Sequence, residues 1–149
     1  MVPSIMRRSI FLLYIVVASC ATTQNRQGIK GQVLWVSGNQ LPGPGVNRSA
    51  HAGVKRELYI YEITTLSQVD QNNEGFYEHI QTPLIATVTT RSDGSFKLKL
   101  PPGVYSIFVK EEGGLFANIF DKNNAINPIT VKEKQYTWVP ITVDYQAAY

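Results

Sequence analysis

The chain has 149 residues, with 14 basic and 11 acidic side chains and a formal net charge of +3 at pH 7. This length suits one domain with its own hydrophobic core. Two basic residues lie in an N-terminal segment that we expect to be removed, which leaves +1, so the charge does not favour a nucleic-acid-binding protein. A single cysteine excludes an intramolecular disulfide.

A targeting segment is predicted at the N-terminus. Arg7 and Arg8 precede the apolar run 10–18, which is too short to span a membrane as a helix but is typical of a signal peptide. Small residues then stand directly before Cys20, a pattern that resembles the lipobox of bacterial lipoproteins. The resemblance implies that residues 1–19 are cleaved and that Cys20 is acylated, palmitate included. The alternative is an ordinary signal peptide in which this cysteine has no role.

Lipidation would divide the rest of the chain into an anchor and a domain. Residues 20–27 would hold the lipidated cysteine and a polar tether, and residues 28–149 would form one domain. Bacterial lipoproteins carry more than one acyl chain, as stable anchoring to a membrane requires. Ala21 stands where enteric lipoproteins retained at the inner membrane have aspartate, so the resemblance implies the outer membrane of a bacterial cell envelope.

Two strands are predicted in the first half of the domain. The segment 29–36, which contains Trp35, is apolar on both faces and suits a strand inside a sandwich. The segment 53–65 alternates, with Leu58 and Ile60 on one face and Tyr59, Tyr61 and Ile63 on the other.

The polar segment 66–83 follows and has no clear period of either kind. We expect Phe76 and Tyr77 to be apolar anchors that hold it to the domain. A long loop in a compact domain is often a binding feature, so this segment is a first candidate for function.

The central region alternates apolar and polar residues with period 2. Turn residues at 93–94 join the run 85–90 to 95–100, and those at 101–103 join 95–100 to 104–109. We predict that these three runs pair successively as antiparallel hairpins.

The last third predicts shorter elements. The segment 115–120 suits either a short edge strand or a packed loop, and 129–131 a short strand. The segment 136–143 predicts a final strand in which Pro140 points outward, as at a sheet edge. Because no helical period extends over ten residues, the predicted fold is an all-β sandwich of about seven strands.

Two motifs resemble carboxypeptidase regulatory-like domains. The first is Gly31-x-Val33 followed by 38–43, and the second combines 93–96 with 100–106. The resemblance implies a prealbumin-like (transthyretin-like, Ig-like) β-sandwich and an accessory or interaction role without catalytic residues. As a whole, the chain resembles small uncharacterised lipoproteins of Gram-negative bacteria. The insert 66–83 departs from the minimal pattern.

Few residues favour catalysis or a cofactor. His51 and His79 are the two imidazoles, and neither accompanies a nucleophile motif. Acidic and amide residues at 70–75 and 121–124 could offer oxygen ligands to calcium, but they lack the spacing of a calcium loop and are typical of Asx turns. We expect no catalytic site, no metal and no cofactor.

Related adhesin domains can form an isopeptide bond between lysine and asparagine or aspartate, assisted by a buried glutamate. Lys30 and Asp144 fall on the first and last strands, and Glu111 on a middle strand. Exposed strand-end residues are the simpler interpretation, because burying such charges is costly.

Aromatic side chains give the remaining indication of function. Trp35, Tyr59, Tyr61 and Trp138, with Tyr136, could form a platform for sugar rings, although strand aromatics more often belong to the core. The candidate binding surface comprises Phe76, Tyr77, Trp35, Tyr59, Tyr61 and Trp138. We predict a non-enzymatic, lipid-anchored envelope module that binds another envelope protein or a glycan. A small periplasmic hydrolase or small-ligand carrier is the alternative.

Overall fold

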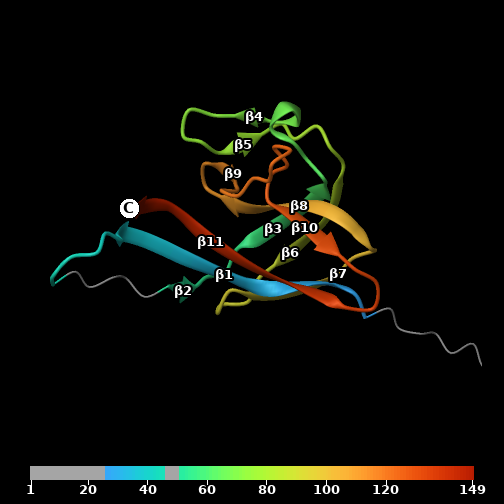
Figure 1. Ribbon diagram of the computed structural model, residues 1–149, viewed down its shortest axis with the longest axis horizontal. Coiled ribbons are helices and arrows are strands. Elements are labelled where there is room, and N and C mark those ends of the chain that lie inside the picture. The colour runs from blue at the N-terminus through green and yellow to red at the C-terminus, as the bar shows by residue number, and fades with distance from the viewer. Residues whose placement is uncertain (1–25, 46–50) are drawn as a thin grey trace, which may run out of the picture.

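The computed structural model describes residues 26–45 and 51–149 (Figure 1). The predicted signal peptide, Cys20 and the tether as far as residue 25 lie outside the described residues. Within the described residues no helix is both long enough and apolar enough to cross a membrane.

The described chain forms strands linked by turns, with one 3₁₀ turn, η1 (Leu66–Gln68). The strands are β1 (Gly28–Asn39), β2 (Ala52–Gly53), β3 (Glu57–Glu62), β4 (Asp70–Gln71), β5 (Tyr77–Glu78), β6 (Leu84–Thr89), β7 (Ser95–Lys99), β8 (Gly103–Glu111), β9 (Gly114–Phe116), β10 (Pro128–Val131) and β11 (Tyr136–Ala148). Seven of these have four residues or more.

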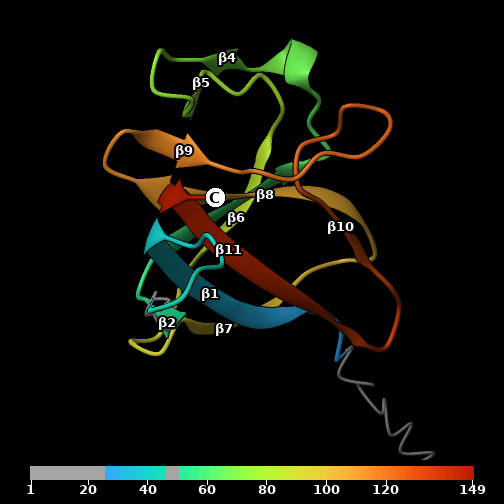
Figure 2. The same ribbon diagram turned by 60° about the vertical axis from the view of Figure 1, so that its left-hand side comes forward.

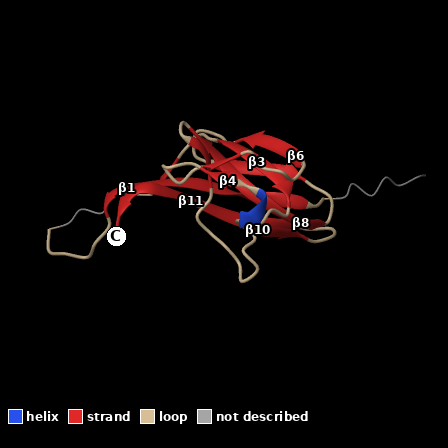
Figure 3. Ribbon diagram, turned by 90° about the horizontal axis from the view of Figure 1, so that it is seen from above, coloured by secondary structure: helices blue, strands red, loops and turns tan. Residues whose placement is uncertain are grey.

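Sheet A has four strands with β1 at its centre. The last strand, β11, pairs with β1 in parallel, from Gly28↔Tyr136 to Asn39↔Ala148. On the other side of β1, β7 and β2 pair antiparallel, one after the other along its length. Figure 3 shows the far ends of β1 and β11 extending beyond the rest of the sandwich.

Sheet B has seven strands in the order β4-β5-β9-β8-β3-β6, and β10 also pairs with β8. The two sheets lie over one another and form the predicted all-β sandwich (Figure 2). Strands in which apolar and polar residues alternate form this fold because each sheet must bury its apolar face, and two such faces can pack against each other.

The main core lies between the sheets and follows the predicted alternation. Leu58, Ile60 and Ile107 of sheet B are fully buried, and Val33 and Val143 of sheet A lie against them in the same cluster. Each such side chain stabilises the fold by roughly 1.5–3 kcal/mol relative to an exposed position. In β11 the exposed Pro140 points away from this core, on a strand whose only ladder is to β1.

The predicted successive hairpins are wrong. β7 pairs with β1 rather than with its sequence neighbours, whereas β6 pairs with β3, and β8 pairs with β3, β9 and β10. The turns at 93–94 and 101–103 therefore carry the chain from one sheet to the other. Alternation and turn residues indicate a strand and its buried face. They do not show whether the next strand pairs with it as a hairpin or lies in the other sheet, because the same pattern occurs in both cases.

The segment 66–83 is structured. It forms η1 and the β4–β5 pair, and β5 extends sheet B by pairing with β9. Phe76 and Tyr77 are buried, the first in the main core and the second in a smaller cluster with Phe108 and Ile126. Because Phe108 alternates with the core residues of β8, this second cluster covers the opposite face of sheet B.

Candidate functional site

The outer face of sheet A brings together residues from the two ends and the middle of the chain. In β1, Lys30 lies in register with Trp138 of β11 on one side and with Lys97 of β7 on the other. These positions alternate with buried residues, so all three side chains face away from the core and are exposed. The indole of Trp138 is 59% exposed, more than any other tryptophan or phenylalanine side chain of the described residues.

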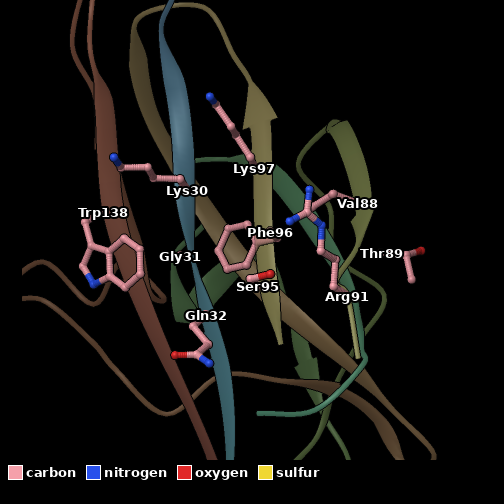
Figure 4. A pocket seen from close by; sticks show the side chains of 10 residues that line it. All are labelled: Lys30, Gly31, Gln32, Val88, Thr89, Arg91, Ser95, Phe96, Lys97 and Trp138. Atoms are coloured by element: carbon pink, nitrogen blue, oxygen red, sulfur yellow. The ribbon is translucent and has the colours of Figure 1, made fainter. Parts of the chain in front are cut away.

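A groove of about 480 Å³ crosses this face. It extends from Trp138, over Lys30 and Gln32 of β1 and over Ser95 and Lys97 of β7, to the end of β6. Val88 and Arg91 line that far end (Figure 4). The lining therefore combines the rings of Trp138 and Phe96, several polar groups and three cations.

The groove is electrostatically one-sided. Lys30, Arg91 and Lys97 line it, and no carboxylate of the described residues does. The ammonium of Lys97 lies 4.3 Å from the ring centroid of Tyr136, a cation–π contact that holds this side chain at the start of β11.

The nearest carboxylate in sequence to β7, Asp93, is bound to its own turn. Its Oδ1 accepts hydrogen bonds from the hydroxyl and the backbone N–H of Ser95, at 2.6 and 2.9 Å. The side-chain hydrogen bond from Ser95, followed by the backbone one, lowers the pKa of Asp93 below its usual value. The charge of Arg91 also lowers this pKa, so the ionised Asp93 partly balances one groove cation, although no ion pair joins the two side chains among the described residues.

The six predicted binding residues do not form one surface. Phe76 and Tyr77 are buried, and Tyr59 and Tyr61 pack against the second cluster. Trp35 is half-buried at the main core, and only Trp138 is exposed.

A polar cluster around the buried Glu111 lies where the ends of both sheets meet, and the sequence did not predict it. The Nε of Arg56, just before β3, donates to Oε1 of Glu111 at 2.6 Å, and the hydroxyl of Tyr145 donates to Oε2 at 2.9 Å. The Arg56 guanidinium lies 5.5 Å from the ring of Trp35, which meets Tyr145 edge-on at 5.3 Å. Burial, and then the hydrogen bond to Glu111, raise the pKa of Tyr145. All members of this cluster have partners, so it joins β3 and β8 to β1 and β11.

The two histidines lie outside the groove. Nδ1 of His79 lies 3.2 Å from Oδ2 of Asp70, but both side chains are largely exposed, and neither lines a hollow. His51 is exposed beside β2. This arrangement gives an imidazole–carboxylate pair in water, without an adjoining enclosed space for a substrate.

The amide and acidic turns bind their own backbone. Asn72 Oδ1 accepts from the N–H groups of Glu74 and Phe76, and Asp121 Oδ1 accepts from those of Asn123 and Ala125. Among the residues that the structure describes, no group of three or more His, Cys, Asp or Glu side chains is placed to hold a metal ion.

The residues weighed for a cross-link lie apart. Lys30 is in register with Trp138, six residues before Asp144 on the same strand, a separation of about 20 Å along the strand. Glu111 is paired with Arg56.

The groove cations were missed because no local pattern distinguishes them. Alternation places Lys30 and Lys97 on wet faces, but their proximity depends on the pairing of β1 with both β7 and β11, across more than 60 residues of sequence. A row of basic residues at alternate positions of predicted strands was the available signal, and it is common on exposed strands.

Fold and site together define an all-β sandwich with a basic, aromatic groove on one sheet. Comparison of the chain with protein-family models, with curated proteins and with solved structures found no match in any of the three.

Proposed function

We propose that this chain is a non-enzymatic binding or structural module of the bacterial cell envelope, anchored through a lipid on Cys20. It meets another envelope protein or a glycan through the outer face of sheet A. The observation that carries the proposal is the exposed indole of Trp138 beside a basic groove. Tryptophan and arginine are enriched at sites of contact relative to the rest of a protein surface, and both line this groove.

The proposed anchoring rests on sequence. The basic pair at 7–8, the apolar run 10–18 and the small residues before Cys20 together support a lipoprotein signal. The resemblance to carboxypeptidase regulatory-like domains supports an accessory role. A two-sheet sandwich is the fold that this resemblance implies, so the fold agrees with the proposed family without identifying it.

One variant tests the proposed anchoring in the full chain carrying a C-terminal tag. We expect the wild type to sediment with membranes and Cys20→Ala to remain in the soluble fraction. A Cys20→Ala protein that still sediments in full would refute lipid anchoring.

The binding face is tested by chemical crosslinking in the intact envelope, followed by capture through the tag. Trp138→Ala should lose most of the crosslinked partner or glycan, whereas Tyr149→Ala, which truncates another exposed aromatic residue, should retain it. Equal recovery with both variants would place the contact elsewhere on the molecule.

A further inference from the structure

We propose that the groove on sheet A binds an acidic glycan, with a sugar ring stacked on Trp138 and its acid groups paired with Lys30, Arg91 and Lys97. This inference rests on the proposed function and narrows it to one class of ligand. Three features of the groove carry it: the exposed ring, an unfavourable placement of cations, and the direction in which the groove crosses the strands.

The first feature is the ring of Trp138. It stands on a face where the neighbouring strand presents Lys30 in register and where Pro140, two residues further on, is also exposed. The indole therefore offers a flat apolar surface bordered by polar groups. Aromatic side chains of this kind stack on planar or ring-shaped ligands that have one apolar face and a polar rim, as a sugar ring has.

The second feature is the pairing of like charges. Lys30 and Lys97 lie directly opposite each other on neighbouring strands, where like charges destabilise a sheet. Lys97 is partly compensated by its contact with the ring of Tyr136, and Arg91 by the charge of Asp93, but no carboxylate of the described chain lines the groove to compensate Lys30. A bound anion would remove this repulsion, so the charge arrangement is complementary to an acidic ligand.

The third feature is direction. The row formed by Trp138, Lys30 and Lys97 crosses three strands, a width of about 10 Å at the usual strand spacing. The groove runs across the strands rather than along one of them, and it continues past the open edge of β7 to Val88 and Thr89 of β6. A peptide that added a strand would use that edge, whereas a chain of sugars would contact side chains across the face.

The experiment measures binding of the full chain, purified in detergent, to three polymers at low ionic strength. The probes are polygalacturonate, its methyl ester, which keeps the sugar skeleton without the charge, and polyglutamate, which keeps carboxylates without sugar rings. The variants are Trp138→Ala, Lys30→Ala and Lys97→Ala. The controls are Tyr149→Ala and Lys110→Ala, which alter an exposed aromatic residue and an exposed lysine outside the groove.

We expect polygalacturonate to bind at least tenfold more tightly than either other polymer. Trp138→Ala should weaken binding at least tenfold, and Lys30→Ala and Lys97→Ala should weaken it several-fold and reduce its dependence on salt. Both controls should bind as the wild type does. Unchanged melting temperatures would show that the groove variants remain folded.

Three outcomes would overturn the inference. Equal binding of the methyl ester would assign a neutral glycan. If polyglutamate binds as tightly as polygalacturonate, and Trp138→Ala does not weaken its binding, the groove recognises an acidic peptide or negative charge alone. Absence of polygalacturonate binding would exclude the ligand class. In each case the proposed function is judged separately, by membrane anchoring and by crosslinking through the Trp138 face.

Discussion

Replacement of Glu111 by alanine should destabilise the fold by about 3 kcal/mol. The change removes a carboxylate whose side chain is only 4% exposed and leaves Arg56 and the Tyr145 hydroxyl without their partner. Breaking a buried ion pair costs roughly 3–5 kcal/mol. We expect the lower end because the Arg56 side chain is 30% exposed and can turn toward water. In a domain of this size that loss lowers the melting temperature by about 10 °C.

The neighbouring glutamate provides a matched control. Glu112 is exposed, so Glu112→Ala should change stability by no more than about 0.5 kcal/mol. Urea unfolding followed by circular dichroism measures both variants. A loss below about 1 kcal/mol for Glu111→Ala would refute the reasoning that this cluster joins the two sheets.

The exposures of the Arg56 and Glu111 side chains also predict which of the two substitutions is more destabilising. Arg56→Met leaves a carboxylate that cannot reach water, and it removes the contact with Trp35 as well, so it should cost more than Glu111→Ala. The double variant should be less destabilised than the sum of the two single variants. Additive losses would show that the two groups do not stabilise each other.

Three further predictions concern the turns, the core and alkaline pH. Gly94 and Gly45 both have positive φ, but a Cβ at Gly94 would lie 2.1 Å from the Val33 carbonyl oxygen, whereas one at Gly45 would meet nothing within 4 Å. Gly94→Ala should therefore lower the free energy of unfolding by at least about 2 kcal/mol, and Gly45→Ala by about 1 kcal/mol. Equal losses for the two variants in thermal unfolding would contradict the predicted clash at Gly94. Leu98→Asp should abolish the cooperative melting transition, because Leu98 packs on the core. Lys99→Asp, on the opposite face of the strand, should retain that transition. A normal transition for Leu98→Asp would contradict the face assigned to Leu98. Stability should fall as pH rises above about 10, because unfolding releases tyrosines such as Tyr145 whose pKa is raised in the fold, so the unfolded state binds fewer protons there. Tyr145→Phe should make that decline shallower, and an unchanged slope in pH-dependent unfolding would exclude a contribution from this residue.

The sequence predicted strands and faces better than it predicted partners. Period-2 alternation correctly put Leu58 and Ile60 on one face of their strand, because the pleat alone decides which side chains share a face. For β8 it predicted one exposed face, but Ser106 and Phe108 on that face are buried as fully as Ile107. It could not show that β7 leaves β8 to pair with β1. That choice depends on which pairing buries both apolar faces at once, a property of the whole chain.

The candidate site was less predictable than the fold for the same reason. Trp138 was recognised as a candidate from its residue type, but grouping it with Trp35, Tyr59 and Tyr61 required a register that the sequence does not contain. Trp138 is exposed whereas these three rings are covered, Tyr59 and Tyr61 at the second cluster on sheet B and Trp35 at the polar cluster around Arg56. Both clusters are built by segments far apart in sequence.

The two proposals constrain each other through the length of the tether. If Cys20 carries the lipid, residues 21–27 can span at most about 25 Å before β1 begins at Gly28, and Lys30 follows two residues later. The groove would then lie within a few tens of ångströms of the membrane surface. Anionic lipid headgroups would compete for its cations only if the groove came within a Debye length, about 8 Å, of that surface. The acidic groups of the ligand must therefore reach close to the membrane. Trp138 would distinguish an acidic glycan from the membrane surface, because a sugar ring can stack on the indole whereas a charged headgroup pairs only with the cations.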